Sequence, residues 1–144
     1  MSLFSTINNL LNIAKAQPNI LYCGEGNIYD ALNGHQDVQY PVFFITQREH
    51  IGNGDLMNYG LDLFFIDREV SDKSNKLQVQ SHAIDVLKNI LRKAGEDYDI
   101  TSAVYHTFEE KFDSVCAGAY VELIIEDVED TDCAYDYQRS ADET

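Results

Sequence analysis

The sequence predicts an α+β fold: a mainly antiparallel β-sheet of about four strands, with two principal helices packed on one face. Two segments carry apolar residues at helical spacing, and several others alternate apolar and polar residues as half-buried strands do. The strands follow one another in pairs, and consecutive strands joined by short loops pair antiparallel. A chain of 144 residues suits one hydrophobic core rather than two.

The first element is a predicted helix that begins near Leu3 and ends before Pro18. Proline disfavours helical geometry at the residue that precedes it, so it marks the end. The apolar face of this helix comprises Leu3, Phe4, Ile7, Leu10, Leu11 and Ala14. The opposite face is polar with little charge, which suits contact with another protein as well as with water: Asn8, Asn9, Asn12 and Lys15.

Two short elements and a strand are expected next. Residues 20–23 suggest a short strand, and residues 27–32 suggest a helical turn. Residues 40–45 have the β-branched and aromatic density of a strand, with Pro41 tolerated near its start.

The clearest strand covers residues 57–66 and follows a glycine-rich turn at residues 52–55. Its apolar face comprises Met57, Tyr59, Leu61, Leu63 and Phe65, and its other face begins with Asn58, Gly60 and Asp62. Phe64 and Ile66 make the end of the strand apolar on both sides. That second apolar side requires cover, either from this chain or from another.

A second helix is predicted between Asn75 and Gly95. Asn75 and Gln78 have the spacing of a capping box, and Gly95 is placed as the stop. The apolar stripe comprises Leu77, Ala83, Ile84, Val86, Leu87, Ile90, Leu91 and Ala94. Basic residues in the last turns suit the negative end of the helix dipole: Lys88, Arg92 and Lys93.

The last two predicted strands form a hairpin with a turn at residues 113–114. The first alternates through Val104, His106, Phe108 and Phe112. The second alternates through Val115, Ala117, Ala119, Val121, Leu123 and Ile125, against Gly118, Tyr120 and Glu122 on its other face.

Acidic charge is concentrated at the C-terminal end. The formal net charge is −15, and residues 126–144 hold eight acids and one arginine, which is seven of those charges. We therefore expect a single α+β domain over residues 1–127 and an acidic, solvated tail over residues 128–144. Within it, Tyr135 and Tyr137 are candidate contacts with a neighbouring subunit. The candidate acidic residues for lining a channel or docking are Glu126, Asp127, Glu129, Asp130 and Asp132.

Composition argues against several classes of function. No apolar run approaches the ~20 residues that span a bilayer, so no membrane association is expected. The acidic surplus repels nucleic acid backbones. Three widely spaced cysteines, an odd number, do not form a disulfide framework and fit a reducing cytoplasm: Cys23, Cys116 and Cys133.

No motif predicts catalysis, a cofactor or a metal. Residues 24–29 begin like a dinucleotide-binding loop but lack the surrounding strand and helix, and residues 130–135 match only the start of a calcium loop. The four histidines lack metal-ligand spacing, and Cys116 is expected to be a buried structural cysteine. Two-sided apolar strands without a catalytic constellation favour a role in assembly.

The layout of residues 1–127 resembles the tail-terminator and tail-completion proteins of tailed bacteriophages, especially those of gut Bacteroidales phages, including the crAss-like group. The residues that carry the resemblance are Tyr40-Pro41-Val42-Phe43-Phe44, the strand from Tyr59 to Asp67, and Asn75-Lys76-Leu77-Gln78-Val79-Gln80-Ser81. The acidic C-terminal tail departs from the family pattern.

The resemblance implies a non-enzymatic subunit of a homo-oligomeric ring in the virion neck, assembled in the host cytoplasm. Such rings are hexameric or dodecameric, contact portal, connector or tail proteins, and let DNA pass without specific binding. A ring of subunits with net charge −15 would have a strongly negative channel, which repels DNA phosphates. Phe64 and Ile66 are the candidate subunit contacts within the domain.

Three other functions fit parts of the sequence. An acidic DNA mimic that inhibits a nucleic-acid-binding enzyme would spread its acids over one surface, whereas here they gather at one terminus. A generic oligomeric adaptor shares the assembly features, and a small enzyme lacks a predicted site. Particle mass and co-purification with capsids separate these functions.

Overall fold

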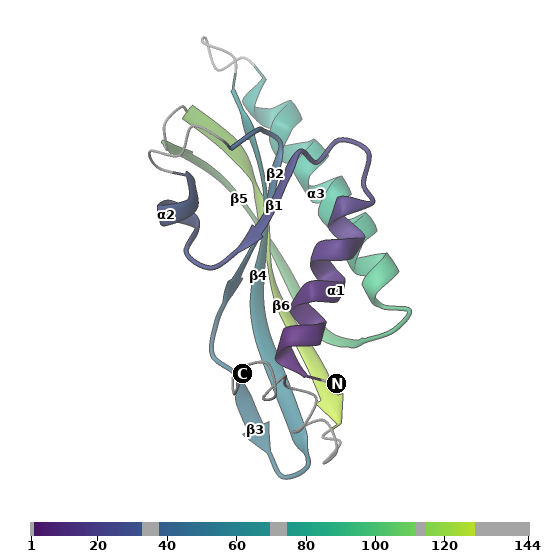
Figure 1. Ribbon diagram of the computed structural model, residues 1–144. Helices are drawn as coiled ribbons and strands as arrows, with labels where there is room; N and C mark the ends of the chain where they lie inside the picture. The colour runs from purple at the N-terminus through teal and green to yellow at the C-terminus, as the bar shows by residue number, and fades with distance from the viewer. Residues whose placement is uncertain (1, 33–37, 70–74, 112–114, 129–144) are drawn as a thin grey trace, which may run out of the picture.

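The computed structural model describes residues 2–32, 38–69, 75–111 and 115–128. It contains a mixed, mostly antiparallel six-stranded sheet with three helices packed against it (Figure 1). The elements are α1 (Leu3–Lys15), β1 (Tyr22–Glu25), α2 (Ile28–Leu32), β2 (Val42–Gln47), β3 (Ile51–Asn53), β4 (Leu56–Arg68), α3 (Lys76–Ala94), β5 (Asp99–Lys111) and β6 (Val115–Val128). The α+β class is confirmed, but the expectation of about four strands was too low. The short strand suggested at residues 20–23 corresponds to β1, and the strand that was not expected, β3, has only three residues, too few for a clear alternating pattern.

The strands lie in the order β1-β2-β4-β6-β5, with β3 paired to β4. Every pairing is antiparallel except β1 with β2, because the chain crosses over through α2 between them. The long central strand β4 has β2 and β6 as neighbours, so Phe64 lies opposite Phe44 on one side and Tyr120 on the other. This register matters because directly opposed residues share one face of the sheet.

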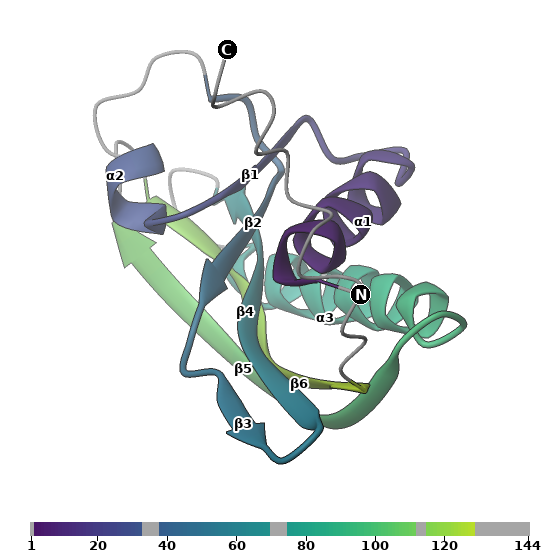
Figure 2. The same cartoon turned by 60° about the horizontal axis from the view of Figure 1, so that its bottom comes forward.

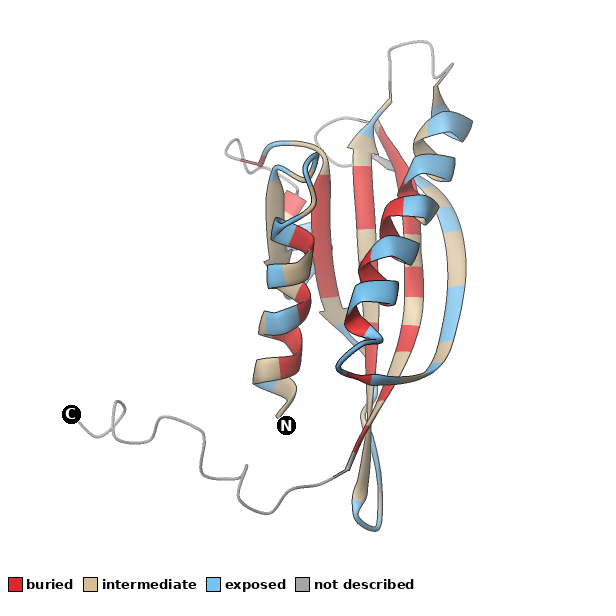
Figure 3. Ribbon diagram, turned by 90° about the vertical axis from the view of Figure 1, so that its right-hand side faces the viewer, coloured by how far each residue is buried: buried red, intermediate tan, exposed pale blue. Residues whose placement is uncertain are grey.

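Helices α1 and α3 cover one face of the sheet side by side, and α2 lies on the other (Figures 1 and 2). The main core forms beneath α1 and α3, where buried residues line the sheet-facing sides of both helices (Figure 3). Alternate residues of the central strands supply its floor: Leu61, Leu63, Phe65, Ala119, Val121, Leu123 and Ile125. The faces predicted for these two strands are therefore confirmed.

Two apolar residues assigned to the buried helix faces are instead exposed. Phe4 is 76% exposed and Leu77 is 75% exposed, each in the first turn of its helix. The predicted cap of α3 is also wrong in detail, because the Asn75 side chain makes no capping hydrogen bond. The first helix does have a capping box, formed by Ser2 and Ser5, which the sequence reading did not identify.

A smaller core lies on the opposite face of the sheet, under α2 and the chain that follows it. Its buried members are Ile28, Leu32, Val38, Val42, Phe44, Ile66 and Cys116. Ile66 is fully buried there by its own chain, so the expectation that a neighbouring subunit covers it was wrong. Helix α2 has only five residues and covers only part of this face, which we call the outer face. The remainder carries the candidate site.

Candidate functional site

The uncovered part of the outer face carries a row of aromatic side chains on three adjacent strands. Phe64 of β4, Tyr120 of β6 and His106 of β5 lie directly opposite one another in the sheet register. Tyr120 stacks on Phe64 with ring centroids 5.0 Å apart and on His106 at 4.8 Å. Phe108 meets the edge of Phe64 at 6.0 Å. These contacts hold the rings as one rigid platform.

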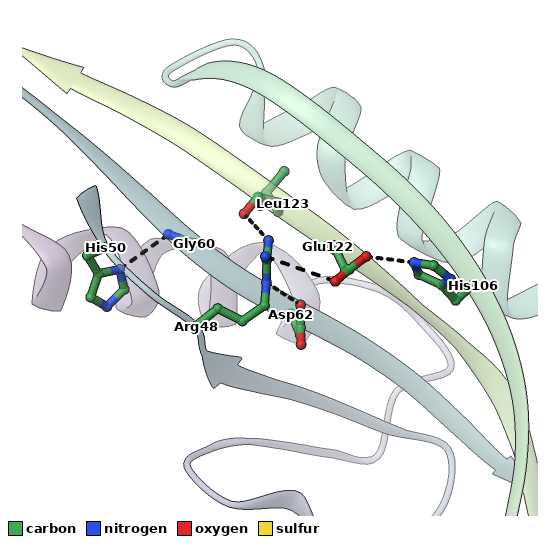
Figure 4. A network of polar contacts seen from close by, with 7 residues as sticks. All are labelled: Arg48, His50, Gly60, Asp62, His106, Glu122 and Leu123. Carbon is green, nitrogen blue, oxygen red and sulfur yellow. Dashed lines mark hydrogen bonds and ion pairs between the residues drawn. The ribbon is translucent and has the colours of Figure 1, made fainter. Parts of the chain in front are cut away.

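A polar network runs beside this platform, two residues further along the strands on the same face (Figure 4). Asp62 and Glu122 lie directly opposite each other on β4 and β6. Arg48 reaches across both strands: its Nε lies 2.7 Å from Asp62 Oδ1, and its Nη1 lies 4.0 Å from Glu122 Oε2. Glu122 Oε1 in turn lies 2.7 Å from His106 Nε2.

The backbone holds Arg48 in this position. The Arg48 N–H donates to the carbonyl of Gly60, which extends the pairing of β2 and β4 by one residue. Its Nη2 also donates to the Leu123 carbonyl at 3.2 Å. Arg48 Nε and Asp62 Oδ1 are buried and close but not aligned for a hydrogen bond, so their contact is an ion pair.

The platform and the network together line a groove of about 280 Å³ between α2 and the sheet. We call it the outer-face groove; its lining residues are Ile28, Tyr29, Asp62, Phe64, Phe108, Tyr120 and Glu122. Four of the seven lining residues are aromatic, and two, Asp62 and Glu122, are acidic. Since Arg48 supplies one positive charge against two negative ones, the groove favours a cation with an apolar stem.

Burial raises the pKa of the Asp62 carboxyl, and the neighbouring Glu122 adds to this effect while Arg48 opposes it. A raised pKa in the folded state stabilises the protein below the ordinary aspartate pKa of about 4. That contribution is lost as the pH rises through the raised value, so the ionised carboxylate carries a cost near neutral pH.

We therefore expect Asp62→Asn to gain stability relative to the wild type as the pH rises from about 4 to 7. The ion pair with Arg48 forms only when Asp62 is ionised, so its loss in the variant opposes this trend and is already part of the net shift of the Asp62 pKa. Urea unfolding at several pH values measures the difference. Asp85→Asn, on the exposed side of α3, is the matched control for the exchange of a carboxylate for an amide. A pH-independent difference for Asp62→Asn would contradict this assignment.

The structure separates the residues that the sequence singled out. Phe64 lies in the outer-face groove, half-buried, and remains a candidate subunit contact. Of the candidate acidic residues for lining a channel or docking, Glu126 and Asp127 lie in strand β6, and Asp127 is buried. The other tail candidates lie outside the described residues: Glu129, Asp130, Asp132, Tyr135 and Tyr137.

The cysteines offer no reactive centre among the described residues. Cys116 is fully buried in the smaller core, as expected for a structural cysteine, and Cys23 packs against the main core. Burial raises the pKa of the Cys23 thiol, which disfavours the reactive thiolate. In the same part of the chain, no group of three or more histidine, cysteine or acidic residues is arranged to hold a metal ion.

The sequence reading missed Arg48, Asp62, Glu122, His106 and Tyr120 as members of one site. It did place Asp62 on the polar face of its strand and Glu122 and Tyr120 on the corresponding face of theirs. The available signal was therefore a pair of strands whose non-core faces carried aromatic and acidic residues. To predict that these residues form one site, one must know how β4 and β6 are aligned, and residues that pair between them, such as Asp62 and Glu122, lie 60 positions apart in the sequence.

Comparison of the chain with models of known protein families and with curated proteins finds no match in either case. Among the described residues, no helix is both long and apolar enough to cross a membrane. The function must therefore be argued from the geometry of the chain itself.

Proposed function

We propose that this chain is a structural, non-catalytic subunit that assembles with copies of itself into a ring. One observation carries the proposal: β5 is a 13-residue strand at the edge of the sheet, paired only with β6 among the described residues. A long open edge presents unpaired backbone N–H and C=O groups, which are a template for pairing with another chain.

Most of the β5 edge lacks the features by which monomeric proteins usually block such pairing; the charged residues Glu109, Glu110 and Lys111 lie only at its end. Between Asp99 and Phe108 it contains no lysine, arginine or proline. Its one irregularity lies between Ile100 and Ser102, so the rest of the strand pairs regularly with β6. Val104, near its middle, is 49% exposed and offers apolar area to a neighbour.

We place this ring in the neck of a tailed bacteriophage, as a tail-terminator or tail-completion protein with neighbouring portal, connector or tail proteins. The support is the resemblance of residues 1–127 to those families and an α+β fold compatible with it. A net charge of −15 for each subunit would give the ring a negative channel, through which DNA passes without adhering.

We expect the purified full chain to form closed rings, seen by negative-stain electron microscopy and weighed by native mass spectrometry. Val104→Lys should raise the concentration at which half of the chains assemble by about tenfold or more, because a charge at the open edge disfavours strand pairing. Its melting temperature should stay close to that of the wild type, since Val104 is half-exposed.

Leu77→Lys is the matched control, because it exchanges an exposed apolar residue on α3 for the same charge. It should assemble as the wild type does. A wild-type chain that remains monomeric at all concentrations would refute the proposed function. Co-purification with phage particles distinguishes the neck ring from a generic oligomeric adaptor.

A further inference from the structure

Three of the ten basic residues of this acidic chain lie close together near the C-terminal end of α3. Lys88, Arg92 and Lys93 are exposed there, within six positions of one another, and we call them the basic cluster. Lys93 pairs with Glu96 at 3.6 Å, whereas Lys88 and Arg92 have no ion-pair partner among the described residues. Beside them, a hollow between the ends of α1 and α3 is lined by Asn12 and Arg92.

The outer-face groove has the chemistry that recognises such a side chain. Its aromatic lining can pack against the apolar stem of a basic side chain, and the carboxylates of Asp62 and Glu122 can accept hydrogen bonds from a guanidinium. Arg48 only partly neutralises these carboxylates, and the raised pKa of Asp62 reflects the cost of the remaining buried charge. A second cation would reduce that cost.

We propose that the outer-face groove of one copy receives the basic cluster of the next copy, with Arg92 as the inserted side chain. This inference rests on the proposed ring and names the contact that builds it. Phe108 of the groove belongs to the edge strand β5, so a neighbour seated in the groove also lies beside the open edge.

The distribution of charge indicates that the partner bound in the outer-face groove is a second copy of this chain. Two chains of net charge −15 repel each other, so a stable contact between them must bring a locally positive surface to a locally negative one. The three positive charges of the basic cluster outnumber the two negative charges of the adjacent Asp85 and Glu96, so the cluster and the outer-face groove form such a pair within the described part of the chain.

The placement of the two surfaces also fits a ring. Helix α3 lies on the face of the sheet opposite to the groove (Figure 2). A contact between two different surfaces joins copies head to tail, and it closes into a ring when the rotation per copy divides a full turn. A symmetric pair of identical surfaces would instead stop at a dimer.

Two full-length variants test the contact, one for each surface. Arg92→Glu reverses a charge of the basic cluster, and the double variant Tyr29→Ala with Glu122→Gln removes an exposed ring and a charge from the groove. Each should raise the half-assembly concentration at least about tenfold, measured by native mass spectrometry. Lys76→Glu, at the other end of α3, is the charge-matched control and should form rings as the wild type does.

Mixing the two variants gives the decisive measurement. Each retains the surface that the other lacks, so an equimolar mixture should form one-to-one dimers that cannot extend, while each variant alone stays monomeric at the same concentration. Melting temperatures confirm that both variants are folded.

The possible failures are distinguishable. The proposed contact is wrong, but the proposed ring is not, if the wild type forms rings and both variants do so equally well. The same conclusion follows if the wild type forms rings and the mixture forms no dimers. If the wild type forms no ring at any concentration, the proposed function and this contact fail together.

Discussion

Replacing Ile66 by aspartate should unfold the chain, lowering the free energy of unfolding by about 4 kcal/mol or more. Ile66 is fully buried in the smaller core, and its neighbours in the sheet are Val42 and Gly118. No described basic side chain lies in that cluster, so an aspartate there would be a buried charge without a partner. Circular dichroism during thermal and urea unfolding measures the loss.

The matched control is Val104→Asp, which places the same charge on the same face of the sheet at a half-exposed position. It should change the unfolding free energy by less than about 1 kcal/mol. The comparison also tests the original expectation for Ile66. A folded Ile66→Asp chain with a normal melting temperature that fails to assemble would restore Ile66 as a subunit contact.

The sequence predicted the layers of the fold because each layer has its own periodicity. The alternation in residues 57–66 and 115–125 places the same residues on the core side as the structure does, and the apolar stripe of residues 77–94 faces them. Such patterns are local, so they can be recognised without knowing how the strands are aligned with one another. The first turns of both long helices are the exception, since only the docked position of a helix decides whether its end extends past the sheet.

Periodicity could not predict which residues bury the outer-face side of β4, where Ile66 lies. Helix α2 has five residues, too few to show a helical period, and Val38 lies in a segment without regular structure. Their contact with Ile66 depends on the crossover that makes β1 parallel to β2. An apolar residue on both sides of a strand therefore indicated that cover was needed, but not whether it came from this chain.

Of the candidate site, only Phe64 was recognised in advance. The groove is a product of register: Asp62 meets Glu122, and Phe64 meets Tyr120, because β4 and β6 pair over their full length. A slip of one residue would send each of these side chains to the opposite face. Arg48 belongs to a loop in the sequence pattern, and its role became visible only through its backbone bond to Gly60.

Replacing Gly118 by alanine should destabilise the chain by about 3 kcal/mol, because a Cβ there has no space. That atom would collide with the carbonyl oxygen of Phe65, and a strand backbone in the centre of the sheet yields less readily than a side chain. Gly118 lies between Ile66 and Phe108, so the shift would also disturb the wall of the outer-face groove.

Gly52→Ala is the control, since its Cβ would meet only the Met57 side chain at 3.5 Å. Urea unfolding should show a loss for Gly118→Ala and a change within about 0.5 kcal/mol for the control; equal stabilities would mean that β4 and β6 can move apart at this point.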